Sequence, residues 1–211
     1  MNKNEKFVIT INRELGSGGR TVGRLLAEKL GVPFYDKALI RALEDRYELT
    51  TDEIERLKSR KRSWWADFKR VMIVGEDAAN STSYHVGSDA DLLTTEALYK
   101  AEKEILMAIA EEESCVIAGR SAFFILNGHP NRLSILIQAS MENRIERVMK
   151  KQNLSWKEAM KVINKVDKMR EEYVKNYAQT SRYDTRNYDL VIKMDGKTEE
   201  QAANLILNYI G

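Results

Sequence analysis

The chain has 211 residues, 43% hydrophobic and 31% charged, so it can bury a sizeable core and wholesale disorder is excluded. With 34 Lys and Arg against 32 Asp and Glu, its formal charge is +2, which gives no global attraction to nucleic acid or membranes. The single cysteine, Cys115, excludes an internal disulfide framework and a cysteine-based zinc site. No apolar run approaches the roughly 20 residues of a membrane span. We therefore expect a cytoplasmic protein, with one domain over residues 1–211.

The first elements in chain order are a strand, a glycine loop and a helix. Residues 7–12 are short, apolar and rich in β-branched side chains, which predicts a strand, and the glycines of 16–19 follow at once. Apolar side chains then recur at helical spacing up to Gly31, which has the position of a helix stop. A short second strand is predicted at 32–35.

The composition changes after residue 50, where a capping box at 50–53 and a basic run at 56–62 precede Trp64 and Trp65. We interpret about 45–95 as a helical insertion, with a mobile polar loop at 80–91. The basic run beside two tryptophans also fits a nucleic-acid patch. Acidic neighbours and the low net charge make a solvated helix the better interpretation.

Strands and helices alternate again from residue 97 onward. Ser140 is expected to cap one helix, and two capping boxes, at 155–158 and 198–201, are expected to open two more. The predicted ranges are helix 97–109, strand 115–118, strand 133–137, a helix from 140, a long helix from 155 through 177, strand 189–193 and a final helix 198–209. This order predicts an α/β fold with a five-stranded parallel sheet covered on both faces, with ligands outside the carboxyl ends of the strands.

The glycine loop is the strongest functional signal in the sequence. Between a strand and a helix, free backbone N–H groups and the helix dipole favour an anion, and glycines let a phosphate approach the main chain. The P-loop consensus G-x-x-x-x-G-K-[ST] is met in part: Gly19 and Thr21 fit, Arg20 stands in place of lysine, and Glu14 replaces the first glycine. Arginine keeps the charge and can bind two phosphate oxygens. The alternative is an ordinary glycine turn.

The run from Ile9 to Gly23, ITINRELGSGGRTVG, followed by PFYD at 33–36, resembles the cytidylate kinase-like family, a branch of P-loop nucleoside monophosphate kinases. The motifs IAGR at 117–120, DKMR at 167–170 and YDLV at 188–191 extend the resemblance over nearly the whole chain. It implies a P-loop three-layer α/β/α fold, a nucleoside monophosphate-binding insertion, and a lid at about 165–187.

The resemblance also implies roles for single residues. The ATP phosphates would be bound by Gly16, Ser17, Gly18, Gly19, Arg20 and Thr21, and the acceptor by Asp36, Arg41, Arg120, Asp167 and Arg170. Thr21 would reach magnesium. The family has an aspartate where this chain has Ala118, and our hypothesis is that Asp36 or Glu14 takes the place of that aspartate at the metal. Arg20, Arg120, Arg170 and Arg182 are the expected catalytic cations, because phosphoryl transfer needs positive charge around the migrating group. Arg186, in the same predicted lid loop as Arg182, is a further candidate.

Some of these arginines have simpler interpretations, since Arg41 and Arg170 each fall on a charged helix face that solvent would cover. His85 and His129 lack partners at ligand spacing and are not predicted to bind metal, and Cys115 is predicted to be core.

Ala118 departs from the family pattern, which has an aspartate before the Gly-Arg. The resulting expectation is a kinase that transfers phosphate from ATP, with Mg²⁺, to a nucleoside monophosphate, with cytidylate the first candidate. The alternatives are a different small acceptor, a nucleotide-binding regulatory protein of the same fold without kinase activity, or an RNA-associated module. The expected partners are nucleotides. The sequence gives no oligomeric state.

Overall fold

A five-stranded, all-parallel sheet forms the centre of the molecule in the computed structural model, which describes residues 1–36, 96–119 and 121–211. The strands lie in the order β2-β3-β1-β4-β5. Their bounds are β1 Val8–Arg13, β2 Phe34–Asp36, β3 Cys115–Ala118, β4 Arg132–Gln138 and β5 Leu190–Lys193. The predicted sheet is confirmed. The predicted insertion at about 45–95, with its basic run and tryptophans, lies outside the described residues.

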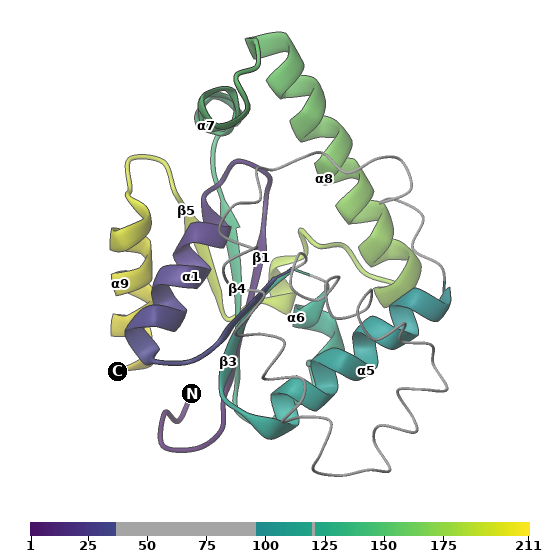
Figure 1. Ribbon diagram of the computed structural model, residues 1–211, viewed down its shortest axis with the longest axis vertical. Coiled ribbons are helices and arrows are strands. Elements are labelled where there is room, and N and C mark those ends of the chain that lie inside the picture. Colours follow the sequence, from purple (N-terminus) through teal and green to yellow (C-terminus); the bar gives the residue numbers. More distant parts are fainter. Residues whose placement is uncertain (37–95, 120) are drawn as a thin grey trace.

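Helices cover both faces of the sheet, as Figure 1 shows, with α1 and α9 on one side and α5 and α6 on the other. The long helix α8 and the shorter α7 stand above the sheet in that view. The helix bounds are α1 Gly19–Leu30, α5 Glu96–Glu112, α6 Ala122–Ile125, α7 Met141–Gln152, α8 Trp156–Ala178 and α9 Glu199–Ile210, with a 3-10 turn η2 at Thr185–Asn187. The three-layer α/β/α architecture is confirmed. The short α6 and η2 were not predicted.

The central strand β1 supplies both halves of the core because successive side chains point to opposite faces. Ile9 and Ile11 pack in the cluster that joins the sheet to α1 and α9, whereas Val8 packs in the cluster that joins it to α5 and α6. Strands buried on both faces are apolar throughout in this way. Cys115 lies fully buried in the second cluster, as predicted, and burial is the main cause that raises the pKa of its thiol.

The helix ends follow the sequence signals. Ser155 and Thr198 each form a complete capping box, with Glu158 and Gln201 respectively, so α8 and α9 begin where predicted. Gly31 ends α1 in the left-handed conformation, with φ +65°. No helix among the described residues is long and apolar enough to cross a membrane.

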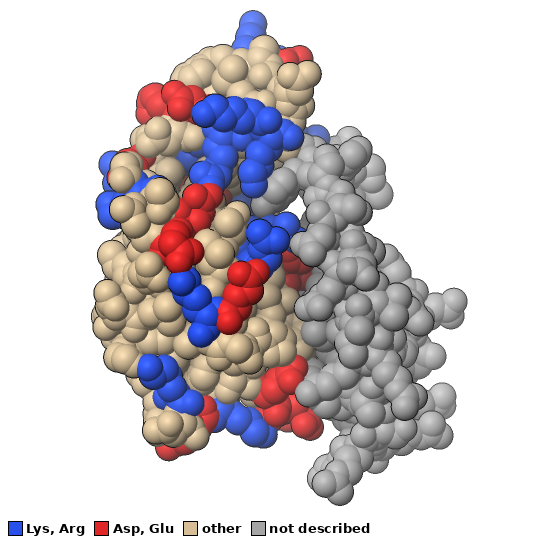
Figure 2. Space-filling view, turned by 60° about the vertical axis from the view of Figure 1, so that its left-hand side comes forward, with Lys and Arg blue, Asp and Glu red and all other residues tan. Residues whose placement is uncertain are grey.

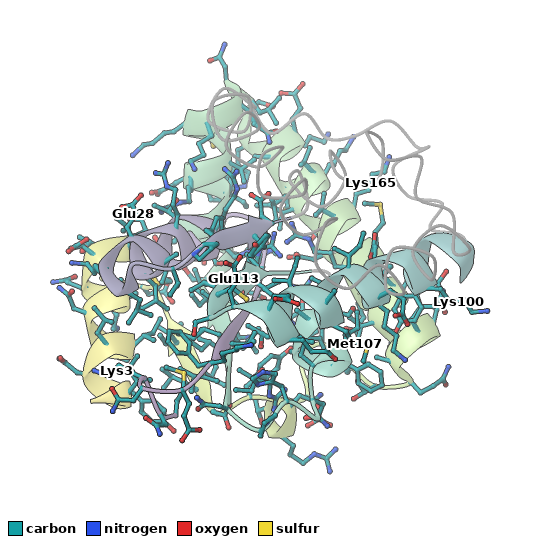
Figure 3. The ribbon with its side chains drawn as sticks, turned by 60° about the horizontal axis from the view of Figure 1, so that its bottom comes forward. Lys3, Glu28, Lys100, Met107, Glu113 and Lys165 are labelled. Carbon is teal, nitrogen blue, oxygen red and sulfur yellow. The ribbon has the colours of Figure 1, made fainter. Side chains whose placement is uncertain are left out.

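Helix α5 crosses one face of the sheet, and its course is marked in Figure 3 by Lys100, Met107 and Glu113. At its end the Tyr35 hydroxyl of β2 donates a hydrogen bond of 2.7 Å to Glu113 Oε1. Burial, followed by this carboxylate, raises the pKa of Tyr35 far above its ordinary value. The bond fixes the edge strand β2, whose last residue, Asp36, reaches the site.

Candidate functional site: a phosphate-binding loop

The glycine loop leaves the carboxyl end of β1 and enters α1 at the centre of the sheet. The chain runs from β1 to one side of the sheet through β2 and β3 and to the other through β4 and β5, so β1 lies at the topological switch point, where open α/β sheets bind ligands. Gly18 is the N-cap of α1, with φ +84° and no side-chain cap, and the first turn carries no acidic residue. The amide groups that begin α1 are therefore not covered by a capping side chain, which suits an anion.

Gly16 shows why the loop needs glycine. Its φ is +84°, a region that L side chains rarely adopt, and a Cβ placed on it would lie 2.7 Å from the carbonyl oxygen of Arg144. Ser17 is buried, and its hydroxyl donates to the Glu14 carbonyl oxygen at 2.9 Å. Ser17 thus shapes the loop from within, while Gly16, Gly18 and Gly19 line the pocket in front of it.

Basic side chains from four elements surround that pocket. We call this pocket the anion pocket. Its basic side chains are Arg13 of β1, Arg20 of α1, Arg147 and Lys151 of α7, and Arg170 of α8. Five of the lining residues are basic and one, Glu14, is acidic. Lys and Arg side chains gather in the upper part of the surface in Figure 2, with acidic side chains below them.

Lys151 shows how closely the basic side chains gather at this pocket. Burial lowers the pKa of its ammonium group, and the neighbouring cations Arg147, Arg20 and Arg24 lower it further. Like charges held this close disfavour the protonated lysine unless an anion compensates them. A bound polyphosphate would supply that compensation.

Arg20 and Asp36 form an ion pair, from Nε to Oδ2, that joins α1 to the end of β2. The Asp36 side chain is buried and that of Arg20 is 32% exposed. Thr21 and Arg20 line the pocket, whereas Asp36 does not. The two residues expected to bind magnesium, Thr21 and Asp36, thus lie on neighbouring elements, with the carboxylate engaged by Arg20. The described residues contain no group of three or more His, Cys, Asp or Glu that could hold a metal by themselves.

Behind the loop lies a buried ionic network that we call the loop support. Asp167 of α8 accepts a hydrogen bond of 3.1 Å from the Leu15 backbone N–H through Oδ1, and its Oδ2 pairs with Arg144 of α7. Arg144 in turn donates through Nε to the Leu15 carbonyl oxygen at 2.8 Å. One residue of the loop, Leu15, is thereby fixed at its N–H and at its carbonyl by side chains of two helices.

Arg182 completes the loop support from the segment after α8. It is 1% exposed, lies 3.5 Å from Asp167 Oδ1, and donates to the Arg13 carbonyl oxygen. Arg170 donates to the same carbonyl at 3.2 Å and lines the pocket. Of the two, Arg170 lies at the pocket, whereas Arg182 lies behind the loop and does not line the pocket.

The structure thus brings together most of the expected site residues. Gly16 to Thr21, Asp36, Asp167, Arg170 and Arg182 all lie at the loop or directly behind it. Arg41 and Arg120 lie outside the described residues. Arg186 lies at the exposed surface and pairs with Asp184 at 2.7 Å.

Sequence reasoning did not single out Arg144, Arg147 or Lys151 on α7. Their spacing places all three on one helix face, directed at the loop, which is a signal that the sequence does contain. Arg147 pairs with Glu199 at the start of α9, and so fixes one wall of the pocket.

The model of the family described as the cytidylate kinase-like family matches residues 8–196. The chain belongs to this family. Among solved structures, an uncharacterized protein from Eubacterium ventriosum is 28% identical with a TM-score of 0.67, and the match covers 97% of this chain and 98% of that one. A shikimate kinase from Bacteroides thetaiotaomicron is 16% identical with a TM-score of 0.51 and the same coverage, which shows a shared fold. This cytidylate kinase-like protein therefore has a nucleotide kinase-type fold.

A curated relative, a uronate isomerase from Corynebacterium glutamicum, is 32% identical over 105 residues. The matched stretch is 50% of this chain and 20% of the isomerase, so the chain spans about a fifth of that relative's length.

Proposed function

We propose that this cytidylate kinase-like protein transfers the γ-phosphoryl group of ATP, with Mg²⁺, to a nucleoside monophosphate, and that cytidylate is the first acceptor to test. The observation that carries the proposal is the anion pocket in front of an uncapped helix N-terminus, built at the switch point of the sheet. Family membership supports it.

The glycine loop would hold the triphosphate, since Gly16, Gly18 and Gly19 line the pocket at the N-terminus of α1, where the helix dipole favours an anion. Arg147, Lys151 and Arg170 would place positive charge around the phosphates from α7 and α8. ATP supplies the activated phosphoryl group, and magnesium would neutralise charge that develops on it. No side-chain nucleophile is required, so catalysis rests on positioning and positive charge.

The sharpest test is an acceptor screen with purified protein, ATP and Mg²⁺ against the common nucleoside monophosphates. We expect ADP formation to rise only when an acceptor is supplied, with cytidylate the best of the set. If another acceptor is preferred, the proposed kinase activity stands and that acceptor replaces cytidylate as the proposed substrate.

A second candidate is a nucleotide-binding regulatory protein of the same fold without kinase activity. The ion pair between Arg20 and Asp36 favours it, because the carboxylate expected at the metal is engaged by the arginine of the loop. Saturable Mg-ATP binding with no acceptor-dependent ADP formation would support this candidate against the kinase.

A variant at Asp36 tests the proposed magnesium site. If Thr21 and Asp36 hold magnesium, Asp36→Ala should reduce magnesium-dependent turnover by about 100-fold while changing the free energy of unfolding far less. Initial rates across a magnesium titration, with urea unfolding alongside, measure both quantities. Unchanged turnover would remove Asp36 from the mechanism.

A further inference from the structure

The side chain of Arg13 passes between two glycines that lie far apart in the sequence. A Cβ placed on Gly19 would lie 2.6 Å from Arg13 Cβ and 3.1 Å from its Cγ, so the stem of the arginine runs over Gly19. A Cβ placed on Gly119 would overlap Arg13 Nη1 and lie 3.0 Å from Cζ, so the guanidinium lies over Gly119. Real Cβ atoms essentially never approach other atoms within 3.0 Å. The Arg13 side chain can therefore take this course only because residues 19 and 119 are both glycine.

Gly19 holds a special place in the loop because it is the first residue of α1 and follows the N-cap Gly18. The P-loop consensus puts its lysine directly after the last glycine of the loop and its first glycine five positions before that last one. Counted from Gly18 instead of Gly19, the lysine position is Gly19, the first glycine position is Arg13 and the Ser/Thr position is Arg20. This count replaces the one from Gly19, because Gly18 is the N-cap of α1. The cationic residue and the glycine have exchanged places, and the Arg13 stem fills the space where a side chain at 19 would begin.

The surroundings of Arg13 favour a role at the reacting phosphates. Arg13 lines the pocket, and its carbonyl oxygen accepts hydrogen bonds from Arg170 and Arg182, which fix its backbone. Strands β1 and β3 are neighbours, with Ile11 paired to Ala118. A guanidinium over Gly119 therefore lies between the glycine loop and the end of β3, where donor and acceptor would meet.

We propose that Arg13 is the cation that contacts the transferring phosphoryl group, in the role that the P-loop consensus gives to lysine. The inference rests on the proposed function. In the transfer, the bond from the γ-phosphorus to the β-γ bridging oxygen breaks and its electron pair stays on ADP. A new P–O bond forms to an anionic phosphate oxygen of the acceptor, so no base is needed. Arg13 donates N–H groups to the phosphate oxygens and is itself unchanged.

The test compares Arg13→Ala, Gly19→Lys and the double variant Arg13→Ala/Gly19→Lys with the wild type. Arg13→Ala should lower kcat by at least about 100-fold, the cost of one lost donor at a transition state. Gly19→Lys alone should also be impaired, because its side chain overlaps the Arg13 stem. The double variant should recover at least about tenfold over Arg13→Ala, since the lysine enters the vacated space.

Lys168→Met is the control: Lys168 lies on α8, its side chain is 77% exposed and it does not line the pocket, so the kcat of this variant should be unchanged. Thermal melting checks each fold, and Arg13→Lys replaces Arg13→Ala if the latter does not fold, with the same expected direction. A variant at 13 with wild-type kcat, or a double variant no better than its Arg13→Ala parent, would overturn the proposal.

ATP affinity, measured by calorimetry, separates this inference from the proposed function. If the wild type binds Mg-ATP but transfers no phosphoryl group to any acceptor, the proposed function fails. The role of Arg13 in phosphate binding is then tested by the Mg-ATP affinity of its variants. Arg13→Ala should weaken Mg-ATP binding at least about tenfold relative to wild type and Lys168→Met. Equal affinities would overturn the role of Arg13, and a wild type that binds no polyphosphate would overturn both.

Discussion

The two sides of the glycine loop differ in how their charges are balanced. Behind it, in the loop support, Asp167 lies between Arg144 and Arg182, and all three are buried. In front of it, in the anion pocket, five basic residues face one acidic residue. The first arrangement fixes the loop backbone, and the second is suited to receive an anion. Arginine therefore has two uses around this loop: behind it, arginine side chains fix the backbone of the loop, and in front of it they are available to an anion.

Removal of Asp167 should show the largest effect. Asp167→Ala leaves Arg144 and Arg182 buried without their shared carboxylate and should destabilise the fold by about 3–5 kcal/mol. Urea unfolding measures the change. Lys168→Ala, at the next position of α8 with a side chain 77% exposed, is the control and should unfold like the wild type. Equal stabilities for the two variants would show that the network does not stabilise the loop.

The loop conformation gives the second-largest effect. Gly16→Ala combines strain at φ +84° with overlap of the Arg144 carbonyl oxygen, whereas Gly31→Ala meets nothing within 4 Å and carries only the strain of φ +65°. We expect Gly31→Ala to cost about 1–2 kcal/mol and Gly16→Ala at least about 1 kcal/mol more. Chemical denaturation of both variants checks the difference. A smaller loss for Gly16→Ala would mean that the loop moves away from Arg144 at little cost.

These contacts mark the limit of what the sequence predicts. Strand alternation, the capping boxes at Ser155 and Thr198 and the stop at Gly31 are local signals, and they predicted the fold. The support by Asp167 joins residues that lie 152 positions apart and leaves no local pattern. The four-residue α6 is too short to show helical periodicity. Arg13 was not singled out, because the exchange of Arg13 and Gly19 gains its meaning only from the path of the side chain over Gly19 and the distant Gly119.

In the anion pocket, removal of one positive charge should weaken the binding of Mg-ATP and leave the fold intact. Lys151→Met should weaken Mg-ATP binding by about tenfold, because one charge-assisted contact to phosphate is lost. Lys150→Met, at the adjacent position of α7, should bind like the wild type because Lys150 does not line the pocket. Calorimetric titrations of the three proteins at one salt concentration make the comparison. Equal binding by both variants would remove Lys151 from the phosphate site.

The smallest effect is a proton taken up on binding. The folded pKa of Lys151 lies below its ordinary 10.5, so repulsion destabilises the folded state at low and neutral pH, and that cost is relieved as pH rises from the folded pKa to 10.5. Phosphate oxygens favour the charged ammonium and should raise its pKa again. Binding at a pH just below 10.5 should therefore take up protons. Calorimetry in buffers of different ionisation enthalpy measures the uptake.

The uptake should fall in Lys151→Met and persist in Lys150→Met. Proton release, or an uptake that is the same in both variants, would contradict the assignment of this charge to the pocket.

The most direct test of the central claim is a crystal structure of the wild-type protein with magnesium and a non-hydrolysable ATP analogue. The account predicts that the β- and γ-phosphates lie within hydrogen-bond distance of the main-chain N–H groups of residues 16–21 and of the Arg13 guanidinium. An analogue bound elsewhere, or a loop whose amides turn away from the phosphates, would contradict it.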